Sequence, residues 1–216
     1  MNERTPAVRR AALIVATLIG IASLLGPSTV AFADPPPPPS ESTARTELAG
    51  LTVGTPHSMT GYSRDAFDVW AGQPDGCTTR QDVLARDGDN VVEGADGCQP
   101  TSGSWYSAYD NKTVTVVAQA TIDHVVPLAD AWRTGADRWT AARRKSFGND
   151  LADAQLIIAS SSSNSSKSDK DPSQWKPPNT AYWCTYGEEY VSVKYKFSLF
   201  VTSAEKTALG DLLDAC

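Results

Sequence analysis

Two short segments of this chain carry side chains that together could hydrolyse a phosphodiester bond. Asp123 and His124 are adjacent and shortly precede Pro127, whereas Asn164 and Lys167 lie in a serine-rich stretch further along the chain. Carboxylate and amide oxygens are ligands that hard divalent cations accept. A neutral imidazole can take a proton from water near neutral pH. The two segments could therefore supply a bound cation and a general base.

An Asp-His pair alone is weak support for catalysis, because a structural histidine explains His124 equally well. The catalytic interpretation depends on the stretch that follows. If the serine run is helical, Asn164, Lys167 and Asp171 fall on one face at positions i, i+3 and i+7. Asp123 on one strand, a short return strand and an amide on the next helix would then form a cradle for a cation. Its oxygen ligands favour Mg²⁺ or Mn²⁺, and also admit Ca²⁺, over zinc.

The elements that must position these residues are short. Local patterns predict helices over 78–86, 128–132 and 139–147, strands over 122–126, 154–158 and 190–200, a β-hairpin over 104–120, and a last helix that a capping box opens at 202–205. Because short strands and helices mix without regular alternation, the predicted fold class is α+β.

These segments resemble the HNH endonuclease superfamily, and more closely the exported actinobacterial GmrSD-type HNH nuclease domain. The resemblance covers roughly residues 58–216 and is carried by DHVVPL at 123–128, FGND at 147–150, QLII at 155–158 and SNSSKSDKDP at 163–172. It implies a ββα-metal core, to which this chain adds a β-hairpin and C-terminal helices. It also implies that His124 is the general base and that Asp123 and Asn164 bind the metal.

Two positions depart from the family pattern. Asn164 stands where the family name implies a histidine, although its carbonyl oxygen suits a hard cation. Gln155 aligns with the asparagine that usually steadies the histidine loop. The group that orients His124 is therefore left open between Gln155 and Asn149.

A nucleic acid is the expected partner, as DNA or also as RNA. Lys167, Lys170 and Arg64 are candidate phosphate contacts; the competing interpretations are solvated positions for the lysines and a carboxylate partner for Arg64. The net charge of −6 opposes binding to a polyanion. Binding therefore requires a local positive strip, to which the basic residues at 143–145 and Lys176 could contribute. Since no base-reading module is visible, we expect little sequence preference.

The N-terminal region predicts export. Residues 1–33 combine early arginines, an apolar run over 11–25 and small residues before a cleavage site at Ala33, which is the pattern of a signal peptide. A membrane anchor is the alternative, but the run is shorter than the roughly 20 residues of a span. Loss of residues 1–33 changes the net charge from −6 to −8. Residues 34–50, with five prolines, predict a Pro-rich linker, and residues 51–216 the nuclease domain.

Four cysteines remain in the predicted exported chain, and an even number indicates two disulfides. Three pairings are open, of which we favour the sequence neighbours Cys77–Cys98 and Cys184–Cys216. A tetrahedral zinc site is the competing interpretation, although no two Cys or His residues stand close together.

The sequence therefore predicts a secreted, monomeric, metal-dependent endonuclease with no membrane attachment in its mature form. The alternative is a disulfide-stabilised extracellular binding module that keeps the scaffold without catalysis. A lipase-type hydrolase with a His-Asp dyad is a poorer third reading, since no serine nucleophile motif accompanies the pair.

Overall fold

The computed structural model describes Met1 and residues 35–216, so the predicted signal peptide and its cleavage site lie outside the described residues. The helices are α1 (Glu41–Gly50), α2 (Thr79–Arg86), α3 (Leu128–Arg133), α4 (Ala141–Gly148), α5 (Ser161–Lys167), α6 (Trp183–Lys196) and α7 (Ser203–Leu213). The strands are β1 (Gly88–Glu93), β2 (Pro100–Ser107), β3 (Lys112–Val114), β4 (Ala120–His124) and β5 (Leu156–Ser160). None of the described helices has the length and apolar character needed to cross a membrane.

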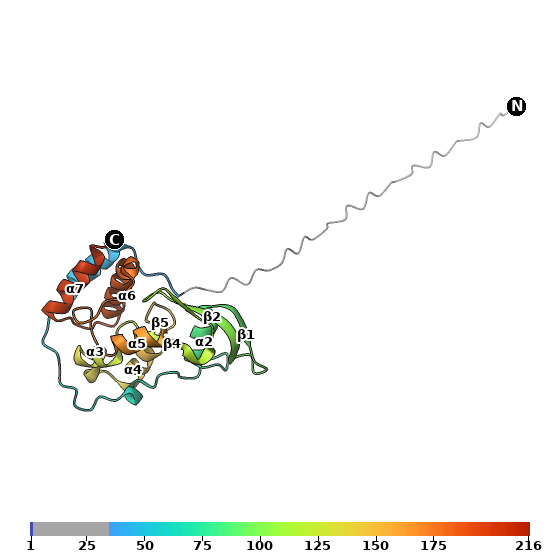
Figure 1. Ribbon diagram of the computed structural model, residues 1–216, viewed down its shortest axis with the longest axis horizontal. Coiled ribbons are helices and arrows are strands. Elements are labelled where there is room, and N and C mark those ends of the chain that lie inside the picture. The colour runs from blue at the N-terminus through green and yellow to red at the C-terminus, as the bar shows by residue number, and fades with distance from the viewer. Residues whose placement is uncertain (2–34) are drawn as a thin grey trace. The chain divides into compact units, whose positions relative to one another are not determined.

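Figure 1 shows β4 and β5, which form an antiparallel pair. Their side chains belong to two hydrophobic cores, one on each face. Asp123 lies opposite Ile157, and His124 lies opposite Leu156. Ile157 belongs to the larger core, with side chains of α1, α3, α6 and α7, whereas Leu156 belongs to the smaller core, with side chains of α2 and β2. Burial on both faces explains the continuous apolar run of β5, and it fixes the strand ends that carry Asp123 and His124.

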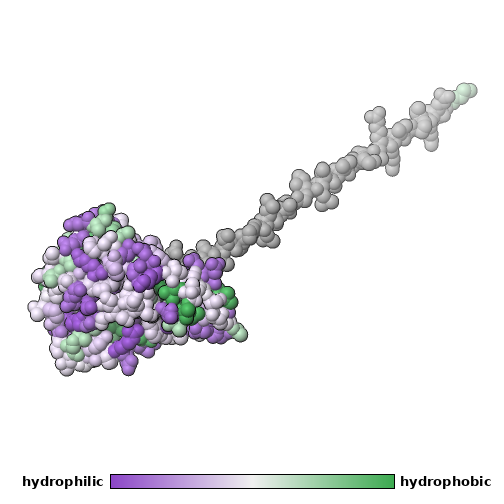
Figure 2. Space-filling model, in the orientation of Figure 1, coloured by the Kyte–Doolittle hydropathy of each residue, from purple (hydrophilic) through white to green (hydrophobic). Residues whose placement is uncertain are grey.

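The predicted β-hairpin is present as β2 and β3, and β1 completes a three-stranded antiparallel sheet. Tyr106 pairs with Thr113 across the hairpin. Trp105 is fully buried and donates its indole N–H to the carbonyl of Leu84 in α2 at 2.8 Å, which attaches the sheet to the rest of the fold. Val92 and Tyr106 are exposed. In Figure 2 a hydrophobic area appears at the end of the molecule where Figure 1 shows β2 and α2.

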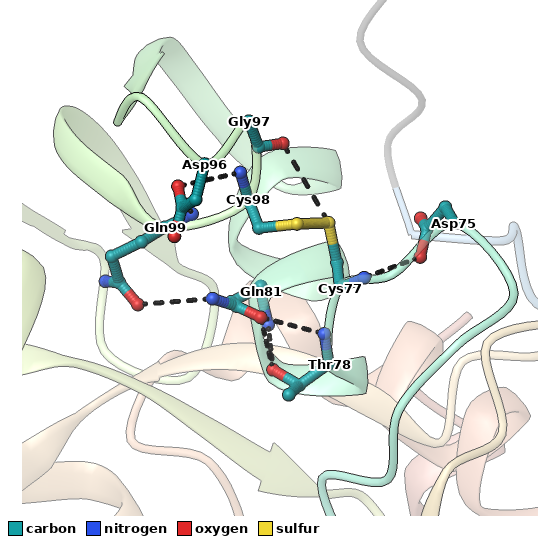
Figure 3. The surroundings of a disulfide bond; sticks show 8 residues. All are labelled: Asp75, Cys77, Thr78, Gln81, Asp96, Gly97, Cys98 and Gln99. Atoms are coloured by element: carbon teal, nitrogen blue, oxygen red, sulfur yellow. Dashed lines mark hydrogen bonds between the residues drawn. A yellow bond between two sulfur atoms is a disulfide. The ribbon is translucent and has the colours of Figure 1, made fainter.

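Both preferred disulfide pairings are confirmed. Cys77–Cys98 joins the turn before α2 to the turn between β1 and β2, where Asp96 accepts the backbone N–H of Cys98 at 3.1 Å (Figure 3). Cys184–Cys216 joins the start of α6 to the chain end. The bridged residues are 21 and 32 positions apart. In the chain-entropy model each bridge contributes about 3 kcal/mol to stability.

The strand predicted over 190–200 is wrong, because most of this segment belongs to helix α6. Its alternating pattern coincides with a helical one, since the buried residues Tyr186, Tyr190 and Val193 are three or four positions apart. Packing of α6 against α1 and α7 outweighs the local preference for a strand.

The predicted Pro-rich linker over 34–50 does not hold for residues 41–50, which form α1. Ser40 caps this helix, because its hydroxyl accepts the backbone N–H of Thr43. Ala44 and Leu48 lie one helical turn apart and are buried in the larger core. Two apolar residues in a polar segment are therefore enough to dock it.

We expect Gly187→Ala to destabilise the fold. A Cβ at Gly187 would lie 2.9 Å from the Cβ of Leu212, so α6 and α7 would have to move apart. Such overpacking costs about 1–3 kcal/mol, which urea unfolding would measure. Gly210→Ala in α7 is the matched control, because nothing lies within 4 Å of its Cβ position. The control should be stabilised by up to about 1 kcal/mol, and equal losses in both variants would contradict the packing argument.

Candidate active site

A cavity of about 310 Å³ opens where β4 ends and α5 passes it. Its lining contains Asp123, His124, Asn164 and Arg64. The remaining lining residues are Tyr62, Ile122, Pro127, Leu128, Ala129, Ser168 and Asp169. The fold thus gathers the two expected metal ligands, the expected base and one expected phosphate contact around one space.

Asp123 and His124 are consecutive in a strand, so their side chains leave it on opposite faces. Asp123 points to the side of Tyr109, whose hydroxyl it accepts, and His124 points to the side of Trp70, whose ring centroid lies 5.5 Å from its own. Because β4 ends at His124, neither side chain is covered by further strand. Both therefore reach the same cavity from its two sides.

The Asp123 carboxylate is bonded on one oxygen and free on the other. Its Oδ2 accepts the hydroxyl of Tyr109 at 2.7 Å and contacts the ammonium of Lys167 at 2.7 Å. Its Oδ1 has no hydrogen-bond partner in the described part of the chain. Burial, followed by the charge of Asp123, raises the pKa of Tyr109 well above its usual value, so this hydroxyl remains a donor. The side chain is thereby held through Oδ2, and Oδ1 is left without a partner in a residue that lines the cavity.

Lys167 does not lie where a phosphate contact would. Its side chain is completely buried, and besides Asp123 its ammonium binds the backbone carbonyl of His124 at 2.8 Å. It is an internal counter-charge that links α5 to the end of β4. Lys170 follows the end of α5 and donates to the carbonyl of Ser166 at 2.7 Å; it is not part of the cavity lining.

Helix α5 forms from a serine run because its N-terminus is anchored. The hydroxyl of Ser160 accepts the backbone N–H of Ser163 at 3.1 Å and donates to Asp110 at 2.8 Å. Burial acts to raise the pKa of Asp110, but hydrogen bonds from Lys112, Ser107 and Ser160 lower it to about 2. A permanently charged carboxylate in the β2–β3 turn therefore holds the start of α5.

Helix α5 ends at Lys167, and the expectation that Asp171 shares a helical face with Asn164 is wrong. Ser168 has a positive φ of 54°, which turns the chain away from the helix axis. Its N–H still bonds the carbonyl of Asn164 at 2.9 Å. The backbone strain at a non-glycine residue lies directly in the cavity wall.

Hydrogen bonding fixes the tautomer of His124. Its Nε2 lies 3.0 Å from the carbonyl of Gly148, which can only accept, so Nε2 carries the proton. Its Nδ1 then has a lone pair and no partner among the described residues. Burial lowers the pKa of His124 to about 3, with the charges of Arg64 and Lys167 acting in the same direction. The imidazole is therefore neutral throughout the physiological pH range.

Gln155 steadies the chain that follows His124. Its side-chain oxygen accepts the N–H of Val126 at 3.0 Å, and its amide donates to the carbonyl of the same residue at 2.9 Å. Its backbone carbonyl accepts the N–H of Val125 at 2.8 Å. Gln155 thus occupies the position that the family resemblance gives to a loop-steadying amide, with one more methylene.

Asn149 supports the candidate site only indirectly. Its side-chain oxygen accepts the N–H of Ala71 and the hydroxyl of Thr79, both at 2.8 Å, and so ties the end of α4 to Ala71 and to the first residue of α2. The ring of His124 is held instead by the preceding residue, Gly148. Sequence reasoning missed Gly148 because the functional group is a backbone carbonyl, which every residue type has.

Charges around the cavity leave Arg64 as the exposed cation at its mouth. Its guanidinium lies 5.6 Å from the ring centroid of Trp70 and forms no ion pair within the described residues. The basic residues at 143–145 are otherwise engaged: Arg143 donates to the carbonyl of Phe197, Arg144 to backbone carbonyls that include Trp139, and Lys145 to Asp68. They do not supply the free positive strip that a polyanion would need.

The donor set fits a hard divalent cation. The Asn164 amide donates through Nδ2 to the hydroxyl of Thr121 at 3.3 Å, which leaves its carbonyl oxygen without a hydrogen bond in the described structure. With Oδ1 of Asp123, the cavity therefore offers two unpartnered oxygens. Such ligands suit Mg²⁺, Mn²⁺ or Ca²⁺, which also keep waters and accept substrate oxygens.

Two comparisons with known proteins give a match. Residues 98–212 match the family model described as the C-terminal domain of GmrSD restriction endonucleases, and this range includes Asp123, His124 and Asn164. An "uncharacterized secreted protein" of Arthroderma benhamiae is 47% identical over 203 residues, which are 94% of this chain and 98% of that protein. No solved structure matches the chain.

We expect Gln155→Ala to lower the free energy of unfolding by about 2–3 kcal/mol, as two buried backbone groups of Val126 would lose their partners. Urea unfolding measures the loss. The exposed Gln174 provides the control, and Gln174→Ala should change stability by less than about 0.5 kcal/mol. A neutral Gln155→Ala would show that the loop after His124 does not depend on this side chain.

Proposed function

Because the chain belongs to the family of the GmrSD restriction endonuclease C-terminal domain, we propose that it is a metal-dependent endonuclease that hydrolyses phosphodiester bonds in DNA, with RNA as the alternative substrate, and with little sequence preference. One observation carries the proposal. A neutral imidazole with an unpartnered Nδ1 lines the same cavity as two unpartnered hard oxygens, those of Asp123 and Asn164.

The order of elements supports a ββα-metal core. Strands β4 and β5 pair antiparallel, and α5 begins directly after β5. Helices α3 and α4 lie between the strands in sequence, and α4 supplies the Gly148 carbonyl that binds the base. In this proposal β4 carries Asp123 and His124, and α5 carries Asn164.

In the proposed reaction each residue of the cavity has a separate role. His124 takes a proton from water at Nδ1, while the Gly148 carbonyl holds the opposite N–H and stabilises the imidazolium that forms. Arg64 binds a phosphate oxygen at the mouth. Asp123 and Asn164 would hold a divalent cation, which would supply charge neutralisation at the phosphate and the leaving oxygen. Tyr109 and Lys167 keep Asp123 in place by occupying Oδ2.

Export forms part of the proposal. The two disulfides fit an extracellular protein, and the relative from Arthroderma benhamiae is described as secreted. We propose that the chain is processed near Ala33 and acts as a monomer on nucleic acid outside the cell.

A second candidate is a binding module without catalysis. The contact of Lys167 with Asp123 favours it, because the carboxylate charge is already balanced inside the protein. This arrangement would be stable without any cation. The two candidates differ in one respect that a single assay measures, which is cleavage of nucleic acid.

We expect the purified protein to nick plasmid DNA with Mg²⁺ or Mn²⁺ and to lose this activity in EDTA. His124→Ala should lower the cleavage rate by about 10²–10⁴-fold, which is the usual contribution of a general base. Cleavage is compared at a temperature at which melting curves show both proteins folded, because removal of this buried, hydrogen-bonded ring also costs stability. The other histidine is the control: His57 bonds Asp137 at 2.8 Å and is not part of the cavity lining, so His57→Ala should cleave normally.

Two outcomes would count against catalysis at His124. A plasmid that stays intact with every divalent cation, and a parallel RNA substrate that also stays intact, would favour the binding module. Equal activity of His124→Ala and wild type would mean that another group takes the proton.

We expect Asp123→Asn and Asn164→Ala to raise the Mg²⁺ concentration for half-maximal cleavage by at least about tenfold, because each removes a proposed ligand. Titration of cleavage rate against Mg²⁺ measures the shift. Melting curves establish that Asp123→Asn, which leaves Lys167 without its counter-charge, is folded under the assay conditions. Asp211→Asn is the control, since Asp211 is exposed and outside the cavity lining. An unchanged Mg²⁺ requirement in both site variants would refute the assignment of these ligands.

A further inference from the structure

The ring of Trp70 contacts two side chains of the candidate active site. Its centroid lies 5.5 Å from that of the His124 ring, and the Arg64 guanidinium lies over it at 5.6 Å. Both distances are within the range of aromatic and cation–π contacts. Trp70 is partly buried against the smaller core and does not line the cavity, whereas His124 and Arg64 do. The ring therefore reaches both groups from behind the space that a substrate would fill.

The backbone at Trp70 is strained. Its φ of 62° is a left-handed conformation that bulky residues rarely adopt, and Asp68 also has a positive φ, of 43°. Such conformations persist only where the surrounding structure holds them, and they concentrate at functional sites. Here the strain places a large aromatic ring beside His124 and Arg64.

The side chain of Asn149 holds this turn closed. Its amide nitrogen donates to the carbonyl of Asp68 at 2.9 Å, and its oxygen accepts the N–H of Ala71 at 2.8 Å. One amide thus bonds the chain on both sides of Trp70. Asn149 was expected to orient His124, and its contacts instead fix the residue that packs against His124.

The same segment lies directly on Gly148. A Cβ at Gly148 would be 3.0 Å from the carbonyl oxygen of Phe67 and 3.0 Å from the side chain of Val69, so only glycine admits this close approach. The carbonyl of Gly148 binds His124 at 3.0 Å. The ring of His124 and the segment that carries Trp70 are therefore supported by one short stretch at the end of α4.

Arg64 depends on Trp70 for its orientation. Its side chain is exposed and has neither a carboxylate partner nor a hydrogen bond within the part of the chain that the structure describes. A free arginine side chain loses much rotamer entropy when it binds a ligand. The face of the Trp70 ring restricts the guanidinium before any ligand arrives, which lowers that cost.

We propose that Trp70 is a positioning residue, whose ring holds the Arg64 guanidinium beside His124 so that a phosphate of the nucleic-acid strand binds next to the base. The proposal rests on the proposed function for the identity of the ligand, but not for its cleavage. Trp70 acts here through Arg64. A ring that stacked on a nucleobase would instead act without it.

Fluorescence anisotropy of a labelled single-stranded oligonucleotide tests the proposal in EDTA at low ionic strength, where no metal-dependent cleavage takes place. Arg64→Ala should weaken binding by about tenfold or more, because it removes a charged hydrogen bond to phosphate. Trp70→Leu should weaken binding by about two- to fivefold, and Trp70→Phe, which keeps an aromatic face, should bind within about twofold of the wild type. In the Arg64→Ala background, Trp70→Leu should have no further effect.

A second tryptophan provides the matched control. The Lys176 ammonium lies 5.2 Å from the ring centroid of Trp183, and neither residue lines the cavity. Trp183→Leu therefore removes a similar contact elsewhere and should leave oligonucleotide binding unchanged. Melting curves identify any variant that is unfolded under the assay conditions.

Three results would overturn the proposal: no measurable binding of the oligonucleotide by the wild type, unchanged affinity in Trp70→Leu, or the same loss from Trp70→Leu with and without Arg64. The last result would indicate that the ring contacts the nucleic acid itself. The plasmid assay tests the proposed function separately. A protein that cleaves nothing but shows the coupled loss keeps the role of Trp70, and one that cleaves normally without the coupling does not.

Discussion

The buried contact between Lys167 and Asp123 is the interaction on which the candidate site depends. The ammonium joins α5 to β4, since it also binds the carbonyl of His124, and no part of the lysine side chain is exposed. Removing one partner of a buried ion pair costs about 3–5 kcal/mol, because the other charge is left uncompensated. The helix that carries Asn164 and the strand end that carries the Asp-His pair are therefore held in one register, whatever enters the cavity.

The functional groups of the site share a pattern in which the protein satisfies one atom and leaves its neighbour available. Asp123 is bonded at Oδ2 and open at Oδ1, and His124 is bonded at Nε2 and open at Nδ1. The amide of Asn164 donates to Thr121 and keeps its oxygen. Each bonded atom fixes a rotamer or tautomer and leaves the other atom of the same group without a partner among the described residues.

The disulfide pairs, the capping box at Thr202 and the gathering of Asp123, His124 and Asn164 around one cavity could be predicted from the sequence. The roles of these three cavity residues stay predictions. Three features could not be predicted. Lys167 has the sequence context of a surface lysine, and only the tertiary fold shows its burial. The Gly148 carbonyl leaves no trace in residue type, and the alternation over 190–200 fits strand and helix equally until α1 and α7 pack against it.

The central claim is that a carboxylate from β4 and an amide from α5 hold one cation beside His124. Anomalous diffraction from crystals soaked in Mn²⁺ tests it without reference to activity. The account predicts a peak roughly 2.0–2.6 Å from both Oδ1 of Asp123 and Oδ1 of Asn164, with Lys167 still on Oδ2. A fully soaked crystal with no peak in this cavity, or with a peak that contacts neither oxygen, would contradict it.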